Sequence, residues 1–564
     1  MKTWITCLLL LAAGGSRSFG QLLNGEEERF TRADSLRGTL TPLRTSYDVT
    51  FYHLNLRVDI DRKTIAGSNR VRFRVVQPFD RLQLDLYANL AIEKIVFRGQ
   101  PLVFTRAFNA VFVQFPEKQK VGSTQEMEVF YGGSPTVAQR APWDGGFVWS
   151  RDAGGKPWVG VACQGAGASL WWPCKDHQSD EPDSMRISVA VPPGVINVSN
   201  GRPRGRQSLP DGYVRYDWYV SNPINTYAVT LNIADYATFG DAYAGQDGNL
   251  SLDYYVLREN LAKARKQFEQ VKPMLACYER YFGPYPFYQD GYKLVETPYL
   301  GMEHQSAVAY GNGYLPGYEG SATSEPGLTF DYIIIHESAH EWWGNSVTSA
   351  DIADMWIHES FATYAEALYV ECRQGYPAAL TYMNAQRSGI GNQQPIIGPY
   401  GVNQEGSGDM YNKGMLMLNT LRGVVNNDQL WFETIGGLAR EFKHKITNAE
   451  GVIAYFNRRL GKDYTYFFDQ YLRHARLPTL LVYYVKKGDQ TLVTFRWDAD
   501  VPDFRMPVRI TTAKGKYEWI EPGTDFKTLP LKGLRFEDLK VADDRFYIDV
   551  KISAQYFDPN AAGN

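Results

Sequence analysis

Short runs in which apolar and polar residues alternate fill the chain from about residue 45 to residue 240. In residues 71–75, Val-Arg-Phe-Arg-Val, the apolar side chains fall on one face of an extended segment and the arginines on the other. Pro, Gly and Asn, which favour turns, separate the runs. The pattern predicts a large antiparallel β domain over residues 45–240, preceded by an extended polar lead-in over 22–44. The expected strands are 48–60, 64–75, 82–87, 111–115, 127–131, 185–191 and 227–232.

Near residue 255 the apolar spacing changes to the three-to-four-residue period of amphipathic helices. A mainly helical domain is therefore expected over residues 241–476, with one short strand at 292–296. The expected helices are 258–280, 329–345, 354–371, 411–425 and 463–473. Alternation returns after Leu477-Pro478 and predicts a small C-terminal β-sandwich over 477–564. Its expected strands are 480–485, 491–496, 508–512 and 546–550. The expected fold class is α+β with several domains.

Size and charge narrow the possible functions. A chain of 564 residues is too long for one core, so two to four domains are expected. Its net charge is −3 and it has no block of Lys and Arg, which argues against a nucleic-acid partner.

The N-terminus has the pattern of an export signal. Lys2 precedes an apolar stretch over residues 4–13, and Ser18-Phe19-Gly20 before Gln21 forms a plausible cleavage site. Ten apolar residues are too few to span a bilayer, and no later stretch is long and apolar enough. Residues 1–20 are therefore predicted to be a signal peptide, and the mature protein to be periplasmic or secreted, with no membrane span.

Four cysteines would remain after removal of the signal, too few for a disulfide scaffold. Cys163 and Cys174 could form a disulfide in an oxidising compartment, or could be two buried free thiols. No Cys-x-x-Cys motif is present, which disfavours a cysteine-type zinc site.

The strongest chemical signal is His336-Glu337-Ser338-Ala339-His340. Histidines four positions apart share one face of a helix and can bind one zinc ion, with the intervening glutamate beside the attacking water. Catalytic zinc needs a third protein ligand. One class of zinc peptidase places a third His six residues after the second, where this chain has Ser346, so that class is excluded.

A carboxylate on a second helix is the alternative third ligand. Glu359 is the preferred residue, because Ala362 and Glu366 share its helical face and the small alanine allows close approach to the first helix. The neighbouring His358 is expected on the helix surface or in a supporting contact. The other candidates are Glu341, Asp351, Asp354, Glu366 and Glu371.

These positions, together with further motifs, resemble the gluzincin zinc aminopeptidase family, which includes aminopeptidase N and leukotriene A hydrolase. Eighteen residues separate His340 from Glu359, as in that family. The further motifs are Gly301-Met302-Glu303, Tyr411-Asn412-Lys413-Gly414, Cys163-Gln164 and Pro173-Cys174-Lys175-Asp176. The resemblance covers residues 45–475 and implies a thermolysin-like catalytic domain over 241–476.

The resemblance also implies a role for each motif. One Zn²⁺ per chain would be held by His336, His340 and Glu359. Glu337 would be the general base and Tyr411 the hydroxyl donor to the oxyanion. Glu303 and Gln164 would bind the substrate's α-ammonium, with Gly301 and Met302 in the same substrate-binding segment. The strand ending at Glu296 is expected to be the sheet edge along which the peptide lies. His304 departs from the family pattern, which has Asn there.

The leading interpretation is a zinc aminopeptidase that hydrolyses the first peptide bond of peptides with a free N-terminus. A thermolysin-type zinc endopeptidase would need the same metal site but not Glu303. A catalytically silent peptide-binding protein on the same fold is the third possibility, although no ligand or base is missing. The preferred first residue and the oligomeric state are left open.

Overall fold

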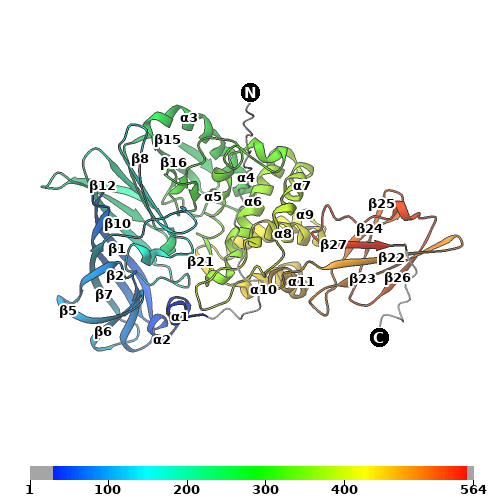
Figure 1. Ribbon diagram of the computed structural model, residues 1–564, viewed down its shortest axis with the longest axis horizontal. Helices are drawn as coiled ribbons and strands as arrows, with labels where there is room; N and C mark the ends of the chain where they lie inside the picture. The colour runs from blue at the N-terminus through cyan, green and yellow to red at the C-terminus, as the bar shows by residue number, and fades with distance from the viewer. Residues whose placement is uncertain (1–29, 555–564) are drawn as a thin grey trace, which may run out of the picture.

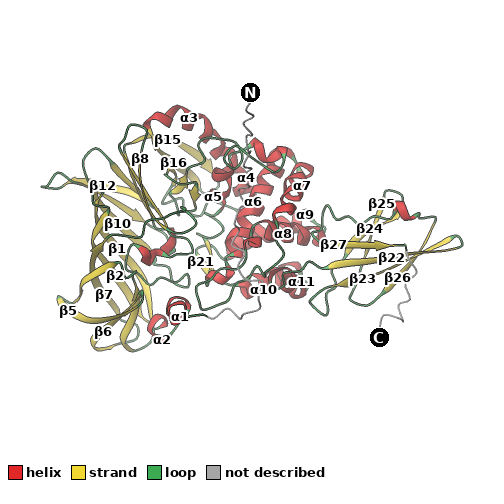
Figure 2. Ribbon diagram, in the orientation of Figure 1, coloured by secondary structure: helices red, strands yellow, loops and turns green. Residues whose placement is uncertain are grey.

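A computed structural model describes residues 30–554 of the chain. Figure 1 shows three parts in a row: a β-rich N-terminal part, a central helical part and a C-terminal group of strands. Figure 2 shows the helices gathered in the centre, with strands on both sides. The expected α+β multidomain class is confirmed. The predicted signal peptide, 1–20, lies outside the described residues.

The N-terminal part is built on a ten-stranded sheet with the order β12-β13-β10-β1-β2-β7-β4-β5-β6-β3. In β2, Val71, Phe73 and Val75 are buried whereas the intervening arginines are exposed, as the alternation predicts. All neighbouring pairs are antiparallel except β1 and β10, which run parallel. The strands are β1 Tyr47–Asp59, β2 Thr64–Val75, β3 Phe79–Asp85, β4 Leu90–Phe97, β5 Gln100–Ala107, β6 Ala110–Gln119, β7 Thr124–Gly133, β10 Ser184–Val191, β12 Arg202–Ser208 and β13 Val214–Val220.

A second N-terminal sheet has the order β11-β14-β9-β8 and shares one apolar core with the first. Its strands are β8 Gly146–Arg151, β9 Pro157–Ala162, β11 Ile196–Ser199 and β14 Leu231–Ala234. The strand expected at 227–232 is wrong in its first half, because residues 226–228 form a 3₁₀ turn capped by the Asn225 side chain.

The expected extended lead-in is also wrong where it is described. Helices α1 Arg32–Gly38 and α2 Pro42–Thr45 occupy this region. Thr31 and Asp34 form a reciprocal capping box at the start of α1, and Pro42 occupies the first turn of α2. Both are helix-start signals in a segment that is otherwise polar.

A five-stranded sheet with the order β15-β16-β17-β19-β18 leads into the central part. Its strands are β15 Tyr236–Gly245, β16 Gly248–Leu257, β17 Tyr292–Glu296, β18 Gly301–Met302 and β19 Val308–Tyr310. The strand predicted at 292–296 is therefore confirmed, but its expected place at the sheet edge is wrong. β17 lies between β16 and β19, and the two edge strands are β15 and β18. The boundary predicted at 240/241 falls within β15.

The central helices are α3 Leu261–Gln267, α4 Val271–Phe282, α5 Tyr332–Ala339, α6 Trp356–Gln374, α7 Tyr376–Ala385, α8 Asn412–Val425, α9 Asp428–Glu441, α10 Ala449–Leu460 and α11 Thr465–Leu472, with a small β20 Val347–Ser349 and β21 Lys445–Thr447 pair. The helix expected at 329–345 is shorter. Asp331 caps its start by accepting two backbone hydrogen bonds, and after Ala339 the chain continues as turns, with Gly344 at φ +123° outside the helical region.

The C-terminal strands are β22 Thr479–Lys487, β23 Gln490–Asp498, β24 Val508–Ala513, β25 Lys516–Ile520, β26 Lys527–Lys532 and β27 Asp549–Ser553. They form a four-stranded sheet, β26-β23-β22-β27, and the hairpin β24-β25. Their buried side chains belong to the same apolar cluster as the central helices, so the two parts share one continuous core. No helix among residues 30–554 has the length and apolar character needed to cross a bilayer.

One disulfide joins Cys277 on α4 to Cys372 on α6, at a sequence separation of 95 residues. Cys163 and Cys174 are both free and buried, which is the second of the two alternatives expected for this pair. Because α6 carries a candidate metal ligand, the disulfide braces the element on which the site is built.

Replacing both Cys277 and Cys372 with Ala is expected to destabilise the oxidised protein by about 4 kcal/mol, because the cross-link restricts a loop of this length in the unfolded chain. Urea unfolding without reductant, followed by tryptophan fluorescence, measures the change. Cys163→Ala serves as a control that lacks one buried thiol and keeps the disulfide. Equal unfolding midpoints for the double variant and the unaltered protein would contradict the expectation.

Candidate active site

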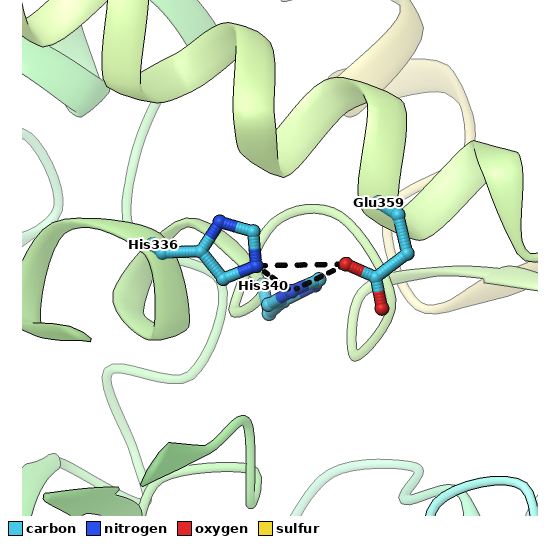
Figure 3. A group of neighbouring side chains, drawn as sticks. All are labelled: His336, His340 and Glu359. Atoms are coloured by element: carbon cyan, nitrogen blue, oxygen red, sulfur yellow. Dashed lines mark hydrogen bonds and ion pairs between the residues drawn. The ribbon is translucent and has the colours of Figure 1, made fainter. Parts of the chain in front are cut away.

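Two consecutive helices bring three potential metal ligands together. His336 lies in α5, His340 directly follows it, and Glu359 lies in the first turn of α6. The Nε2 atoms of the two histidines are 3.2 Å apart, and Glu359 Oε2 lies 3.5 and 3.4 Å from them (Figure 3). All three side chains are buried.

This geometry fits one zinc ion. When zinc binds nitrogen and oxygen tetrahedrally at about 2.0–2.1 Å, its ligand atoms lie about 3.4 Å from one another. The three separations of 3.2, 3.5 and 3.4 Å match that value. Glu359 Oε2 is also buried without a hydrogen bond to any described residue, which leaves this oxygen for an ion. Two imidazoles and one carboxylate form a ligand set that leaves a fourth position for a reactant.

Hydrogen bonds on the far side of each imidazole fix its orientation. His336 Nδ1 lies 2.6 Å from Glu366 Oε1, and His340 Nδ1 lies 2.8 Å from the carbonyl oxygen of Trp343. Both partners accept, so each Nδ1 carries the proton and each Nε2 is free to bind a metal. The hydroxyl of Tyr382 donates to the other oxygen of Glu366. Glu366 is thus a supporting residue, and its place two turns after Glu359 on the same helical face is the signal for it.

Glu337 is buried beside the three ligands. A Cβ atom added to Gly301 would come within 2.8 Å of Glu337 Oε1, so the glycine leaves the space in which this carboxylate sits. Burial raises the pKa of Glu337 to about 7, and the nearby Glu303 carboxylate acts in the same direction. A carboxyl group with this pKa can both accept and release a proton near neutral pH.

Glu303 follows the edge strand β18 and is also buried. Gln164 Nε2, from the loop after β9, donates to Glu303 Oε1 at 2.7 Å and to Glu359 Oε1 at 3.1 Å. Glu303, Glu337 and His340 have ligand atoms within 4.8 Å of one another. Burial raises the pKa of Glu303. The β-rich N-terminal part therefore contributes directly to the site, as the motif at Gln164 predicts.

A buried tyrosine and histidine lie behind the site. The Tyr227 hydroxyl lies 3.4 Å from Nδ1 of His358, and burial together with the nearby Glu303 carboxylate raises the pKa of Tyr227. The backbone N–H of Ser349 donates to His358 Nε2 at 2.8 Å. His358 is fully buried, so its expected place on the helix surface is wrong, and its ring lies between Tyr227 and Ser349. The motifs gave no signal for Tyr227.

Tyr411 immediately precedes α8 and faces the same ligands. Its ring stacks on His336 with centroids 6.2 Å apart. Burial and the nearby carboxylates raise its pKa well above the usual value, so the phenol stays protonated and can donate a hydrogen bond.

All of these groups line one cavity of about 600 Å³. No lysine or arginine is among its lining residues in the described part of the chain, whereas five acidic residues are. Such a wall attracts cations and disfavours an anionic ligand. Its acidic members are Asp144, Glu303, Glu337, Glu359 and Glu405, and it also includes Gln164, Gly301, Met302, His336, His340 and Tyr411. Glu405 is the acidic residue that the motifs did not single out.

His304 is fully buried, and neither of its ring nitrogens has a hydrogen-bond partner among residues 30–554. Burial lowers its pKa to about 3, so the ring is neutral. It does not line the cavity. The histidine that stands where the family pattern has Asn therefore lies in the packing behind Glu303 and not in the cavity wall.

Comparison with known proteins adds an independent observation. The family model described as "Peptidase family M1 domain" matches residues 266–471. Tricorn protease-interacting factor F2 from Thermoplasma acidophilum is 21% identical over 523 residues, which cover 89% of this chain and 61% of that protein. Aminopeptidase B from Rattus norvegicus is 25% identical over 403 residues, which cover 67% of this chain and 56% of the relative. The chain thus spans about three fifths of the length of these relatives.

Among solved structures, an M1 zinc metallopeptidase from Deinococcus radiodurans bound to a Tyr-Ser-Ala substrate has a TM-score of 0.64 with 21% identity. The match covers 77% of this chain and 96% of that one, and shows that the two share a fold. The matched residues 266–471 contain all three metal-ligand candidates. They also contain Glu303, Glu337 and Tyr411. Residues 266–471 thus match the domain of peptidase family M1, and the motifs of the chain resemble those of the gluzincin aminopeptidases.

Proposed function

We propose that this protein is a zinc-dependent aminopeptidase that removes the first residue from peptides with a free N-terminus. The observation that carries the proposal is the position of Glu303, whose carboxylate lies in the cavity wall beside Glu337 and His340. A carboxylate that binds an α-ammonium there would leave room for only one residue before the scissile bond. Several relatives of the chain are named as aminopeptidases, which supports the same reaction.

His336, His340 and Glu359 would hold the zinc ion. When bound, zinc supplies a Lewis acid that polarises the scissile carbonyl and acidifies the attacking water. Glu337 would take a proton from that water and deliver it to the leaving amine, a role that its raised pKa suits. Glu366 would keep His336 in the tautomer that binds metal.

Tyr411 would stabilise the developing oxyanion. Addition of water to the carbonyl places a negative charge on its oxygen, and a donor already in position stabilises that charge without reorganisation. Tyr411 stays protonated, lies against His336 and opens onto the cavity.

Glu303 and Gln164 would bind the α-ammonium. Two carboxylates, Glu303 and Glu359, share the Gln164 amide, so the site is electronegative where the amine would enter. An endopeptidase needs an open cleft on both sides of the metal and has no use for a buried carboxylate at this point. The complete ligand set and base also favour an enzyme over a silent binding protein.

We further propose that the protein is exported, to the periplasm or beyond the cell. The N-terminal pattern of residues 1–20 is the primary support. The Cys277–Cys372 disulfide supports it independently, because disulfides persist in oxidising compartments.

Glu337→Gln is expected to lower kcat by about 1,000-fold while the protein still binds one zinc ion per chain, because the base is lost and the ligands remain. Kinetics with a chromogenic amino-acid amide and elemental analysis of the same sample measure both quantities. His340→Ala provides the contrast, since it should lose the metal as well. A zinc-free Glu337→Gln protein would contradict the role given to this residue.

Glu303→Gln is expected to reduce the preference for free over N-acetylated amino-acid amides by about 100-fold, because a charge-assisted contact to the ammonium is removed. The unaltered enzyme should cleave only the free amides, and a chelator should stop it. Zinc content should stay the same in the variant. If the unaltered enzyme cleaves both forms at equal rates, the aminopeptidase proposal fails.

Tyr411→Phe is expected to lower kcat by about 100-fold with little change in KM, because the hydroxyl acts on the transition state more than on the bound substrate. Steady-state kinetics with one free amide separate the two constants. A change confined to KM would show that Tyr411 binds the ground state instead.

A further inference from the structure

One acidic side chain of the cavity has no task in the proposed reaction. Glu405 lies six positions before Tyr411, in the loop that leads to α8, and lines the cavity together with Tyr411 and Gln164. Glu405 is solvent-exposed and is one of the residues that line this cavity. No described residue donates a hydrogen bond to its carboxylate or forms an ion pair with it.

The loop that carries Glu405 is fixed against the side of the cavity where the amine would bind. Asn403 Nδ2 donates to the carbonyl oxygen of Gly165 at 3.2 Å, directly after Gln164. Gly401 is held from two sides, by Thr39 Oγ1 at 2.9 Å and by Asp351 Oδ2 at 3.1 Å. Glu405 is therefore presented by an anchored loop next to the Gln164 loop.

The charges of the cavity leave Glu405 unmatched. Four glutamates line it near the ligand triad, and under the proposed function a zinc ion and an α-ammonium would supply three positive charges. Glu359, Glu337 and Glu303 would take part in binding these two cations. Glu405 is then the one glutamate of the four without a cation. Asp144, also in the wall, already accepts two backbone hydrogen bonds, at 2.6 and 2.8 Å.

The surroundings of Glu405 contain no compensating cation. No Lys or Arg lines the cavity within residues 30–554. A carboxylate beside other carboxylates gains most from a ligand that brings a positive charge.

We propose that Glu405 binds a cationic side chain on the first residue of the substrate, so that the enzyme prefers peptides that begin with Lys or Arg. The inference rests on the proposed function, which places the α-ammonium at Glu303 and Gln164. The first residue's side chain projects from the carbon that bears this ammonium, so it lies on the same side of the cavity as the Gln164 and Asn403 loops. Glu405 is the free carboxylate on that side.

Fluorogenic amides of Arg, Lys, citrulline and Leu, all with free amines, test the inference. Citrulline has nearly the shape of Arg without its charge. The unaltered enzyme should favour Arg over citrulline in kcat/KM by about tenfold or more, mainly through KM, and this ratio should fall with added salt. Glu405→Gln should lower kcat/KM for Arg and Lys at least tenfold more than for Leu.

Two further variants sharpen the test. Glu405→Asp keeps the charge on a shorter side chain and should retain part of the preference. Asp144→Asn removes a charge elsewhere in the wall and should keep the Arg-to-citrulline ratio. Equal rates for Arg and citrulline in the unaltered enzyme would overturn the inference while the aminopeptidase proposal stands, and so would an equal loss on all four amides in Glu405→Gln. Cleavage of N-acetylated amides as fast as free ones would contradict the aminopeptidase proposal itself.

Discussion

The packing of α5 against α6 is the contact on which the rest of the site depends. It places two imidazoles and one carboxylate within 3.2–3.5 Å of one another in a buried setting. Burying a carboxylate and two polar rings is unfavourable unless their polar atoms are satisfied. Glu366 and the Trp343 carbonyl satisfy the outer nitrogens, so the inner atoms remain for a cation. The Cys277–Cys372 disulfide braces α6 from its other end.

Around this pair of helices, the two larger parts of the chain complete the site together. The central part supplies the ligands, Glu337 and Tyr411, whereas the N-terminal part supplies Gln164, which donates a hydrogen bond to Glu303. The amine-binding carboxylate is thus positioned at the junction of the two parts. Their relative placement therefore bears on which bond is cut, while the metal site is internal to the helical part.

The sequence was most informative where a local pattern decides the outcome. Strand β2 and strand β17 have the predicted bounds, and helical periodicity was enough to choose Glu359 from several acidic residues. The early end of α5 at Ala339 depends on a change to turns, in which Glu341 and Trp342 donate to the carbonyl oxygens of Ser338 and Ala339, and an apolar pattern does not reveal this change. The cysteine pairing joins segments 95 residues apart and depends on the packing of α4 against α6. The position of β18 at the sheet edge is likewise a matter of strand order, which alternation alone leaves open. Tyr227 and Glu405 lie on segments without a motif and reach the site only through the tertiary fold.

The central claim is that a buried carboxylate beside the metal ligands limits the reaction to the first peptide bond. Mass spectrometry of a linear ten-residue peptide, incubated with the zinc-loaded enzyme and sampled at low conversion, tests it most directly. The account predicts products that shorten one residue at a time from the N-terminus, and an intact peptide when its N-terminus is acetylated. Internal fragments at low conversion, from either form of the peptide, would contradict it.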